Sequence, residues 1–493
     1  MIVKKYLLIV LTLILSCTSL VCVENSLVDF STRFLKGLPE FIGYDIRRGM
    51  TNEMKVFYAS HHEWSKSPFT LKSNELGAAF DTFIRGCRDD ANFNNASTWV
   101  NKVRPPVSLF NTFRTQPEIA YPYIQKVVVP EDSTILFMGD THASPHSLLR
   151  ALWRWRLLGY MGNDFKLKEK CFFVILGDYV DYGNGGAEMW YLLAILKRHN
   201  WNQVFMLRGN HELWSLDDLL SEATFFNELA YKFGVAAAAG LINKLMCAYN
   251  LLPSALLIGT NGNYILCQHG GADATYSAVN LLQEGNFYDY LSAVHNFAYD
   301  GTAHGGLTNN RFIGRYYSDD PYTMPIETDI AALSTNYSSG NNRTRVIVRG
   351  HQHVNIPECF CFIRKGYPVG TDPNTTILPG WQAEDNVSLA DQNDITKGSF
   401  SLANPDCYPI YTLFSAPANF TRYDCFARIK TAAEFSQWRF KLYQRDLDID
   451  QKYYRNFARF ELYNTGDIRT VYSEYHQPFN RPLSNELLEL AVA

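Results

Sequence analysis

Five short segments of the sequence each end an apolar run with a cluster of aspartate, histidine or asparagine. They read GlyAspThrHis at 139–142, GlyAspTyrValAspTyrGly at 177–183, ArgGlyAsnHisGlu at 208–212, GlnHisGlyGly at 268–271 and ArgGlyHisGlnHis at 349–353. Carboxylate, imidazole and amide groups together suit Mn, Fe or Zn, and no segment carries the thiolate that is typical of structural zinc sites. One such segment usually marks an ordinary turn, but five in series predict a metal centre.

A centre with two metal ions needs a ligand that bridges them, and a carboxylate can offer one oxygen to each ion. We interpret Asp178 as this bridge. The other predicted ligands are Asp140, His142 and His353 for the first metal, and Asn210, His269 and His351 for the second.

The segments that must position these residues alternate between strand-like and helix-like patterns from Ser133 onward. Short apolar runs predict strands at 134–138, 171–176, 203–207, 264–267, 345–348 and 410–414. Apolar residues at three- and four-residue spacings predict helices at 147–158, 187–198 and 213–233. This alternation indicates an α/β fold. Ligands gather at the carboxyl ends of strands in such folds, so we expect the polar tips to converge.

We divide the chain into a leader at 1–23, an N-terminal extension at 24–131, a catalytic domain at 132–425 and a C-terminal extension at 426–493. The N-terminal extension is expected to be helical. Residues 365–406 are rich in Gly, Pro, Asn and Asp and predict a long surface excursion, whereas 438–443 and 457–463 alternate like edge strands. Both extensions are expected to cover the sheet, with a regulatory role as the alternative.

The first 23 residues have the layout of a secretory signal peptide. Lys4 and Lys5 precede an apolar run that is followed by small or neutral residues. An uncleaved membrane anchor and a lipoprotein signal at Cys17 are the alternatives. We therefore expect a secreted or extracytoplasmic protein. Eight cysteines then remain, as disulfides or as buried free thiols, namely Cys87, Cys171, Cys247, Cys267, Cys359, Cys361, Cys407 and Cys425.

The charge balance argues against one class of partner. The chain has 45 Lys plus Arg against 49 Asp plus Glu, and no long basic run after its start. A nucleic-acid partner is therefore not expected.

With these motifs the chain resembles the metallophosphoesterase superfamily and, within it, the phosphoprotein phosphatases, which are calcineurin-like serine/threonine phosphatases. The resemblance rests on GlyAspTyrValAsp, ArgGlyAsnHisGlu, HisGlyGly and LeuPheSerAlaProAlaAsn at 413–419, and it runs from about residue 132 to about residue 421. It implies a central β-sandwich flanked by helices, a dinuclear metal site, and hydrolysis of phosphate monoesters by a metal-bound hydroxide without a phosphoenzyme.

The resemblance also implies two catalytic residues. His211 matches the general acid that protonates the leaving oxygen, and Asp181 matches the carboxylate that orients it. A histidine beside a carboxylate can donate a proton near neutral pH, which agrees with this role.

Three positions depart from the family pattern, namely Tyr182, Ala143, which replaces a glycine after GlyAspThrHis, and His353. Tyr182 stands where the phosphatases have a phosphate-gripping arginine, so an aromatic substrate could stack there. His353 after His351 is closer to the wider superfamily than to the protein phosphatases. His146 is an additional histidine, which we expect at the surface.

The leading hypothesis is an exported protein phosphatase that acts on phosphoserine, phosphothreonine or phosphotyrosine. The alternatives are a hydrolase of small phosphoesters or nucleotides, and a non-catalytic binding module on a phosphatase scaffold. The expected partner is thus a phosphorylated protein or a small phosphoester, and a membrane is expected only through an uncleaved leader.

Overall fold

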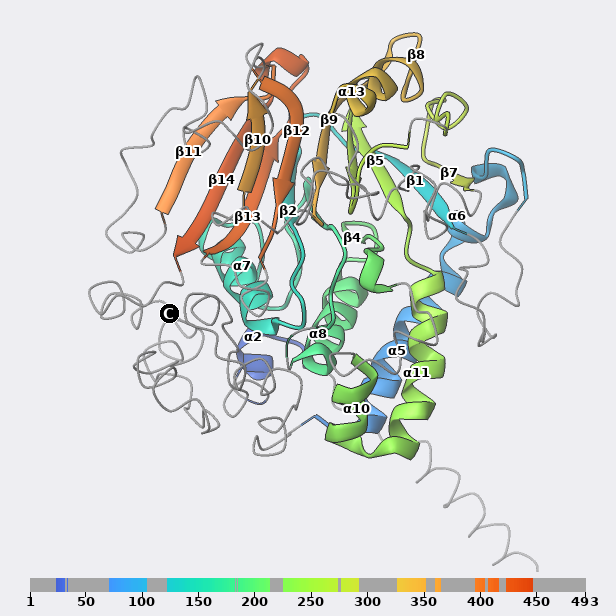
Figure 1. The fold of residues 1–493 in the computed structure, drawn as a ribbon, viewed down its shortest axis with the longest axis vertical. Coiled ribbons are helices and arrows are strands. Elements are labelled where there is room, and N and C mark those ends of the chain that lie inside the picture. The colour runs from blue at the N-terminus through green and yellow to red at the C-terminus, as the bar shows by residue number, and fades with distance from the viewer. Residues whose placement is uncertain are drawn as a thin grey trace, which may run out of the picture.

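The computed structural model describes residues 24–31, 33, 71–103, 122–181, 183, 185–212, 225–273, 276–291, 326–351, 360–364, 395–403, 407–415 and 423–446. Two β-sheets face each other, and most of the helices gather beside one of them (Figure 1). The predicted leader and the predicted strand at 457–463 lie outside the described residues.

The first sheet has six strands. Their order is β11 (Ile395–Ser401), β14 (Arg439–Asp446), β13 (Tyr423–Lys430), β2 (Thr134–Met138), β3 (Cys171–Ile175) and β4 (Val204–Met206). The strands β2, β3 and β4 are parallel, with Met138 opposite Ile175 and Ile175 opposite Met206. Their carboxyl ends therefore lie side by side.

The second sheet has eight strands. Its order is β10 (Phe360–Arg364), β12 (Cys407–Leu413), β9 (Asn342–Arg349), β6 (Asn263–Gln268), β5 (Ala255–Thr260), β1 (Tyr123–Val128) and β7 (Phe287–Tyr290), and β8 (Ser338–Ser339) pairs with β9. The strands β6 and β9 are parallel, and Gln268 lies opposite Arg349. Their carboxyl ends are therefore also adjacent.

Side-chain alternation divides the core into layers. Along β2, Ile135 and Phe137 join the apolar cluster between the two sheets, whereas Leu136 and Met138 join the cluster beneath the helices. The helices on that side are α5 (Ser73–Asp89), α7 (Pro145–Leu157), α8 (Gly186–His199), α10 (Phe225–Phe233) and α11 (Val235–Asn250). Residues of α13 (Ile326–Thr335) pack in a third cluster on the second sheet.

Several short elements complete the described structure. They are α2 (Leu27–Phe30), α6 (Ala91–Asn94) and the 3-10 turns Ala96–Thr98, Asn210–Glu212 and Phe435–Gln437. None of the helices within the described residues is both long and apolar enough to span a bilayer. Cys87, Cys171, Cys247 and Cys267 are buried free thiols in this part of the chain, and Cys425 is also buried.

The predicted α/β class, with a central β-sandwich flanked by helices, is confirmed, and each of the six predicted core strands corresponds to a strand of the structure. One expectation is wrong: β14 is not an edge strand, because β11 pairs with its outer side. The sequence of β11 does not predict a strand, because Gly398 and two serines interrupt any apolar alternation. The strands β1 and β14 extend the sheets beyond the residues 132–425 that the sequence analysis gave to the catalytic domain.

Candidate active site

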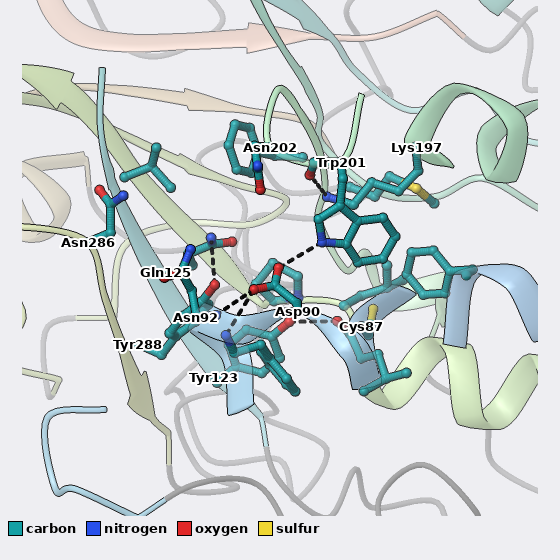
Figure 2. A pocket seen from close by; sticks show the side chains of 18 residues that line it. Cys87, Asp90, Asn92, Tyr123, Gln125, Lys197, Trp201, Asn202, Asn286 and Tyr288 are labelled. Carbon is teal, nitrogen blue, oxygen red and sulfur yellow. Dashed lines mark hydrogen bonds between the residues drawn. The ribbon is translucent and has the colours of Figure 1, made fainter. Parts of the chain in front are cut away.

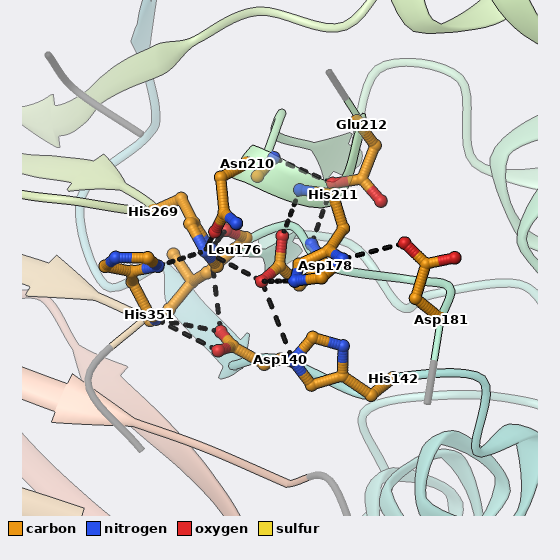
Figure 3. Close-up of polar contacts among 12 residues, drawn as sticks. Asp140, His142, Leu176, Asp178, Asp181, Asn210, His211, Glu212, His269 and His351 are labelled. Carbon is orange, nitrogen blue, oxygen red and sulfur yellow. Dashed lines mark hydrogen bonds and ion pairs between the residues drawn. The ribbon is translucent and has the colours of Figure 1, made fainter. Parts of the chain in front are cut away.

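The predicted metal ligands converge at the carboxyl ends of five strands (Figure 3). Asp140 and Asp178 follow β2 and β3, and Asn210 begins the turn after β4. His269 directly follows β6, and His351 follows β9. Each sheet therefore contributes side chains to the same place, as the position of polar residues at strand ends predicted.

Asp178 lies at the centre of this group. Its Oδ2 atom is 3.0 Å from His269 Nε2, 3.7 Å from His142 Nε2 and 4.0 Å from His211 Nε2. Asp178 is buried, and this oxygen has no well-aligned hydrogen-bond donor among the described residues. Two groups of potential ligand atoms share Asp178, one with His142 and His211 and the other with His269 and His351.

Main-chain carbonyls fix the orientation of two of the imidazoles. His142 Nδ1 donates to Val180 O at 3.0 Å, and His269 Nδ1 donates to Leu176 O at 2.9 Å. A carbonyl only accepts, so Nδ1 carries the hydrogen in both rings and a neutral ring presents the Nε2 lone pair to the site.

The Nε2 lone pair of His269 faces two other acceptors. His269 Nε2 lies 3.0 Å from Asn210 Oδ1 and 3.0 Å from Asp178 Oδ2. The ring nitrogen and the two oxygens would repel one another if nothing lay between them. A second ring proton on His269 or a bound metal ion would remove this repulsion. The donor set of carboxylate, imidazole and amide oxygen fits Mn, Fe or Zn.

Electrostatics support the same conclusion. Burial, with the charge of Asp178, raises the pKa of Asp140 to about 7. Burial alone would lower the pKa of His269, but Asp178 and Asp140 raise it overall. Burial also lowers the pKa of His142 to about 3, so this ring is neutral at physiological pH and available as a ligand. Metal ions would therefore displace protons from the site.

Two features of the structure bear on the predicted grouping of the ligands, which stays a prediction. The carboxylate of Asp140 accepts from His351 N at 3.0 and 3.1 Å, and its Oδ1 lies 3.5 Å from His269 Nδ1. The grouping of potential ligand atoms around His142 contains His211 and not Asp140. His353 lies outside the described residues, so its role stays a prediction.

His211 and Asp181 form a pair at the side of the site. His211 Nδ1 lies 2.7 Å from Asp181 Oδ2, and the amide of His211 donates to Asp178 Oδ1 at 2.9 Å. The side chain of His211 is 17% exposed, whereas that of His142 is 0% exposed. His211 can therefore meet an incoming substrate while it stays in contact with the metal ligands.

The backbone of the site is strained. His142, Asp178, Asp181 and His351 all have positive φ angles, of 40°, 53°, 67° and 64°. Such conformations cost free energy in non-glycine residues and persist where the surrounding structure imposes them. Gly209 allows one close approach, because a Cβ atom there would collide with Asp178 Oδ1.

Glu212 holds this strained turn, a role that the sequence analysis missed. Its carboxylate accepts from the amides of Asp178 at 2.8 Å, Tyr179 at 2.9 Å and Gly209 at 2.8 Å. Burial, with the nearby charge of Asp178, raises its pKa to about 7. Its place at the end of ArgGlyAsnHisGlu is the only sequence signal for this role.

One expectation about a nearby residue is wrong. His146 is 1% exposed and not a surface residue. It is the second residue of α7, and every residue of this helix from Pro145 to Trp155 is buried. Tyr182 lies outside the described residues, so the stacking hypothesis stays a prediction.

A cavity of about 300 Å³ lies elsewhere in the molecule, and none of the predicted ligands lines it (Figure 2). Its charged groups are already paired: Asp90 Oδ2 accepts from Trp201 Nε1 at 2.7 Å, and Lys197 Nζ donates to Trp201 O at 2.6 Å and Val204 O at 2.8 Å. The protein itself therefore satisfies both charged groups of this cavity.

Comparison with known proteins gives a consistent picture. Residues 133–355 match the family model of the calcineurin-like phosphoesterases. A putative serine/threonine-protein phosphatase of Caenorhabditis elegans, C06A1.3, is 34% identical over 140 residues, which are 28% of this chain and 33% of that protein. The catalytic subunit of serine/threonine-protein phosphatase 6 from the same organism is 30% identical over 156 residues, which are 31% of this chain and 41% of that protein. The chain thus spans less than half the length of these curated relatives.

A solved structure is also similar. It is a serine/threonine phosphatase from Saccharomyces cerevisiae with similarity to human phosphatase PP5, and it aligns with a TM-score of 0.43 at 16% identity over 77% of this chain and 91% of that chain.

Proposed function

Since residues 133–355 belong to the calcineurin-like phosphoesterase family, we propose that this chain hydrolyses phosphate monoesters with two metal ions. The observation that carries the proposal is the position of Asp178, whose Oδ2 lies within 4.0 Å of His142, His211 and His269, with His211 bonded to Asp181. A shared carboxylate suits a bridging ligand, and the adjacent histidine suits a general acid.

The roles of the side chains follow from their contacts. His142 and Asp178 would hold one metal, and Asp178, His269, His351 and Asn210 would hold the other. Asp140 stays a proposed ligand of the first metal from the sequence pattern, and its carboxylate accepts from the amide of His351. When bound, the ions would act as Lewis acids and lower the pKa of a water molecule.

His211 would act on the leaving group. Its Nδ1–H is bonded to Asp181, so the Nε2 atom is the one that can give a proton to the leaving oxygen of the ester. The Asp181 carboxylate stabilises the positively charged ring before that transfer and holds it in one orientation.

We propose phosphoserine and phosphothreonine in proteins as the substrate class. The proposal is supported by the relatives named above, which are serine/threonine phosphatases by name. Phosphotyrosine peptides and nucleotides are the competing substrates in the test that follows.

The test uses the chain without residues 1–23, supplied with manganese. Turnover of phosphoserine, phosphothreonine and phosphotyrosine peptides is compared with turnover of nucleotides, for the parent, His211→Ala and His199→Ala. We expect the phosphoserine and phosphothreonine peptides to react fastest, and His211→Ala to lower the rate by at least about 10²-fold. His199 is the matched control, because its Nδ1 contacts Asp164 O at 2.8 Å on the surface.

Three outcomes would change the proposal. Faster turnover of nucleotides would move it to a small-molecule phosphoesterase. A preference for phosphotyrosine would support substrate stacking at Tyr182. Absence of activity with any metal would favour the binding scaffold.

We also propose that the chain is exported, supported by Lys4, Lys5 and the apolar run that follows. Expression of the full chain in a secreting cell, with sequencing of the product's N-terminus, tests this. We expect a product in the medium that begins near residue 24. An intact N-terminus in the membrane fraction would instead indicate an anchor, and a lipid on Cys17 would indicate a lipoprotein.

A further inference from the structure

Helix α10 begins directly against Asp181. The amide of Phe225 donates to Asp181 Oδ1 at 2.7 Å, and Asp181 Oδ2 lies 2.7 Å from His211 Nδ1. Each carboxylate oxygen therefore has its own donor, which fixes the plane of the group. The φ angle of Asp181 is 67°, a conformation that needs such support.

A buried ion network joins α10 to α8. Lys232 Nζ lies 2.6 Å from Glu188 Oε2 and 2.8 Å from Glu228 Oε1, and the three side chains are 0%, 3% and 1% exposed. Glu228 also accepts from the amides of Gly186 and Ala187, each at 2.9 Å. These are the first two residues of α8, so the carboxylate caps the positive end of that helix.

Charge and packing both hold α10 in place. Burial works against the charge of Lys232, but the two carboxylates raise its pKa overall, so it stays an ammonium ion. The ring of Phe225 is buried against Gly186, where a Cβ atom would come within 2.7 Å of it. The start of α10 therefore cannot shift without disturbing the start of α8.

We propose that α10 is the positioning element of the proposed general acid. In this arrangement the Phe225 N–H orients Asp181, Asp181 orients His211, and the Lys232–Glu228–Glu188 network keeps the N–H in place. The inference rests on the proposed function, in which His211 donates the proton to the leaving oxygen.

The leaving group provides a selective readout. An alkoxide such as the serine oxygen leaves poorly unless it is protonated, whereas para-nitrophenolate leaves readily without a proton. A misplaced general acid therefore slows phosphoserine hydrolysis far more than hydrolysis of para-nitrophenyl phosphate. A general loss of folded protein or of metal ions would slow both reactions alike.

The first experiment compares Phe225→Pro with Phe225→Ala. Both variants remove the ring, but only proline removes the N–H, and proline is tolerated at the first position of a helix. We expect Phe225→Pro to hydrolyse a phosphoserine peptide at least about tenfold more slowly than Phe225→Ala, with less than about a twofold difference on para-nitrophenyl phosphate. Equal ratios of the two activities in both variants would overturn the proposal.

The second experiment tests the ion network with Lys232→Met, with Lys232→Arg as the conservative variant. Lys244→Met is the matched control, because Lys244 Nζ lies 2.5 Å from Asp81 Oδ2 in a pair that is 40% and 46% exposed, between α11 and α5. We expect Lys232→Met to lose phosphoserine hydrolysis selectively, Lys232→Arg to recover part of it, and Lys244→Met to match the parent.

The outcomes separate the two levels of the proposal. Equal loss of both activities in Lys232→Met, with manganese content unchanged, would contradict a positioning role for the network. If Lys232→Met does not fold, the Phe225 pair decides. A parent that hydrolyses neither substrate would refute the proposed function itself.

Discussion

The metal-ligand group and the α8–α10 contact both bury several charged side chains. The two regions differ in the hydrogen-bond and ion-pair partners that these charges have. Between the helices, Lys232 lies between two carboxylates, and Glu228 accepts two further amide hydrogens. At the strand ends, Asp178 Oδ2 has no well-aligned donor in the described structure, and Asn210 Oδ1 faces a ring nitrogen of His269. The helix network therefore neutralises its own charges, whereas the strand ends place a carboxylate oxygen and an amide oxygen around one imidazole nitrogen, an arrangement that suits a bound cation.

The largest expected effect comes from the bridge. Asp178→Asn removes the charge that both metal sites share, and we expect hydrolysis of para-nitrophenyl phosphate to fall by about 10³-fold, which corresponds to a loss of several kcal/mol of transition-state stabilisation. Asp164→Asn is the control, because Asp164 lies on the surface with a side chain that is 53% exposed. Activity of Asp178→Asn within about tenfold of the parent would mean that this carboxylate does not bridge.

Loss of the buried ammonium group of Lys232 should lower the stability of the fold. Lys232→Met leaves Glu188 and Glu228 buried without their cation, so we expect the free energy of unfolding to fall by about 3–5 kcal/mol. Lys244→Met breaks an exposed pair and should cost less than about 1 kcal/mol. Urea unfolding of both variants measures the difference. Similar costs would show that the α8–α10 contact is no tighter than a surface ion pair.

A smaller effect is expected from pH on metal binding. The pKa of Asp140 is raised to about 7, so its carboxyl is protonated below that pH and a metal ion must displace the proton. Calorimetry should therefore show manganese affinity falling about tenfold per pH unit below pH 7 for each displaced proton. Affinity that is constant between pH 5 and 7 would exclude proton displacement.

The same carboxyl affects the metal-free protein. Its pKa is raised from 3.8 to about 7 on folding, so its contribution to stability is fully present below about pH 4 and is lost as the pH rises through about 7. Unfolding of Asp140→Asn, compared with the parent across this range, isolates that contribution. Identical pH profiles would contradict it.

The metal-ligand group could be predicted from the sequence, whereas the α8–α10 contact could not. The ligand-bearing segments were readable because each apolar strand and its polar tip are neighbours in sequence, so Asp178 and His269 could be chosen from local patterns. The contacts of Phe225 with Asp181 and of Glu228 with α8 join residues that are 44 and 42 positions apart. Only the packing of the helices brings them together, so no local pattern could predict them.

Packing also explains the two expectations that were wrong. The strand β14 alternates like an edge strand, but the weakly patterned β11 pairs with its outer side. His146 has the polar character of a surface residue, but it lies on a helix that is buried along most of its length. Both depend on what lies across the element, which its own sequence does not contain.

The most direct test of the two-metal account is a titration of activity with manganese. The chain without residues 1–23 is first freed of metal with a chelator, and hydrolysis of para-nitrophenyl phosphate is followed as manganese is added. The account predicts no activity without metal and saturation at two ions per chain. Activity in the metal-free protein, or saturation at one ion, would contradict it.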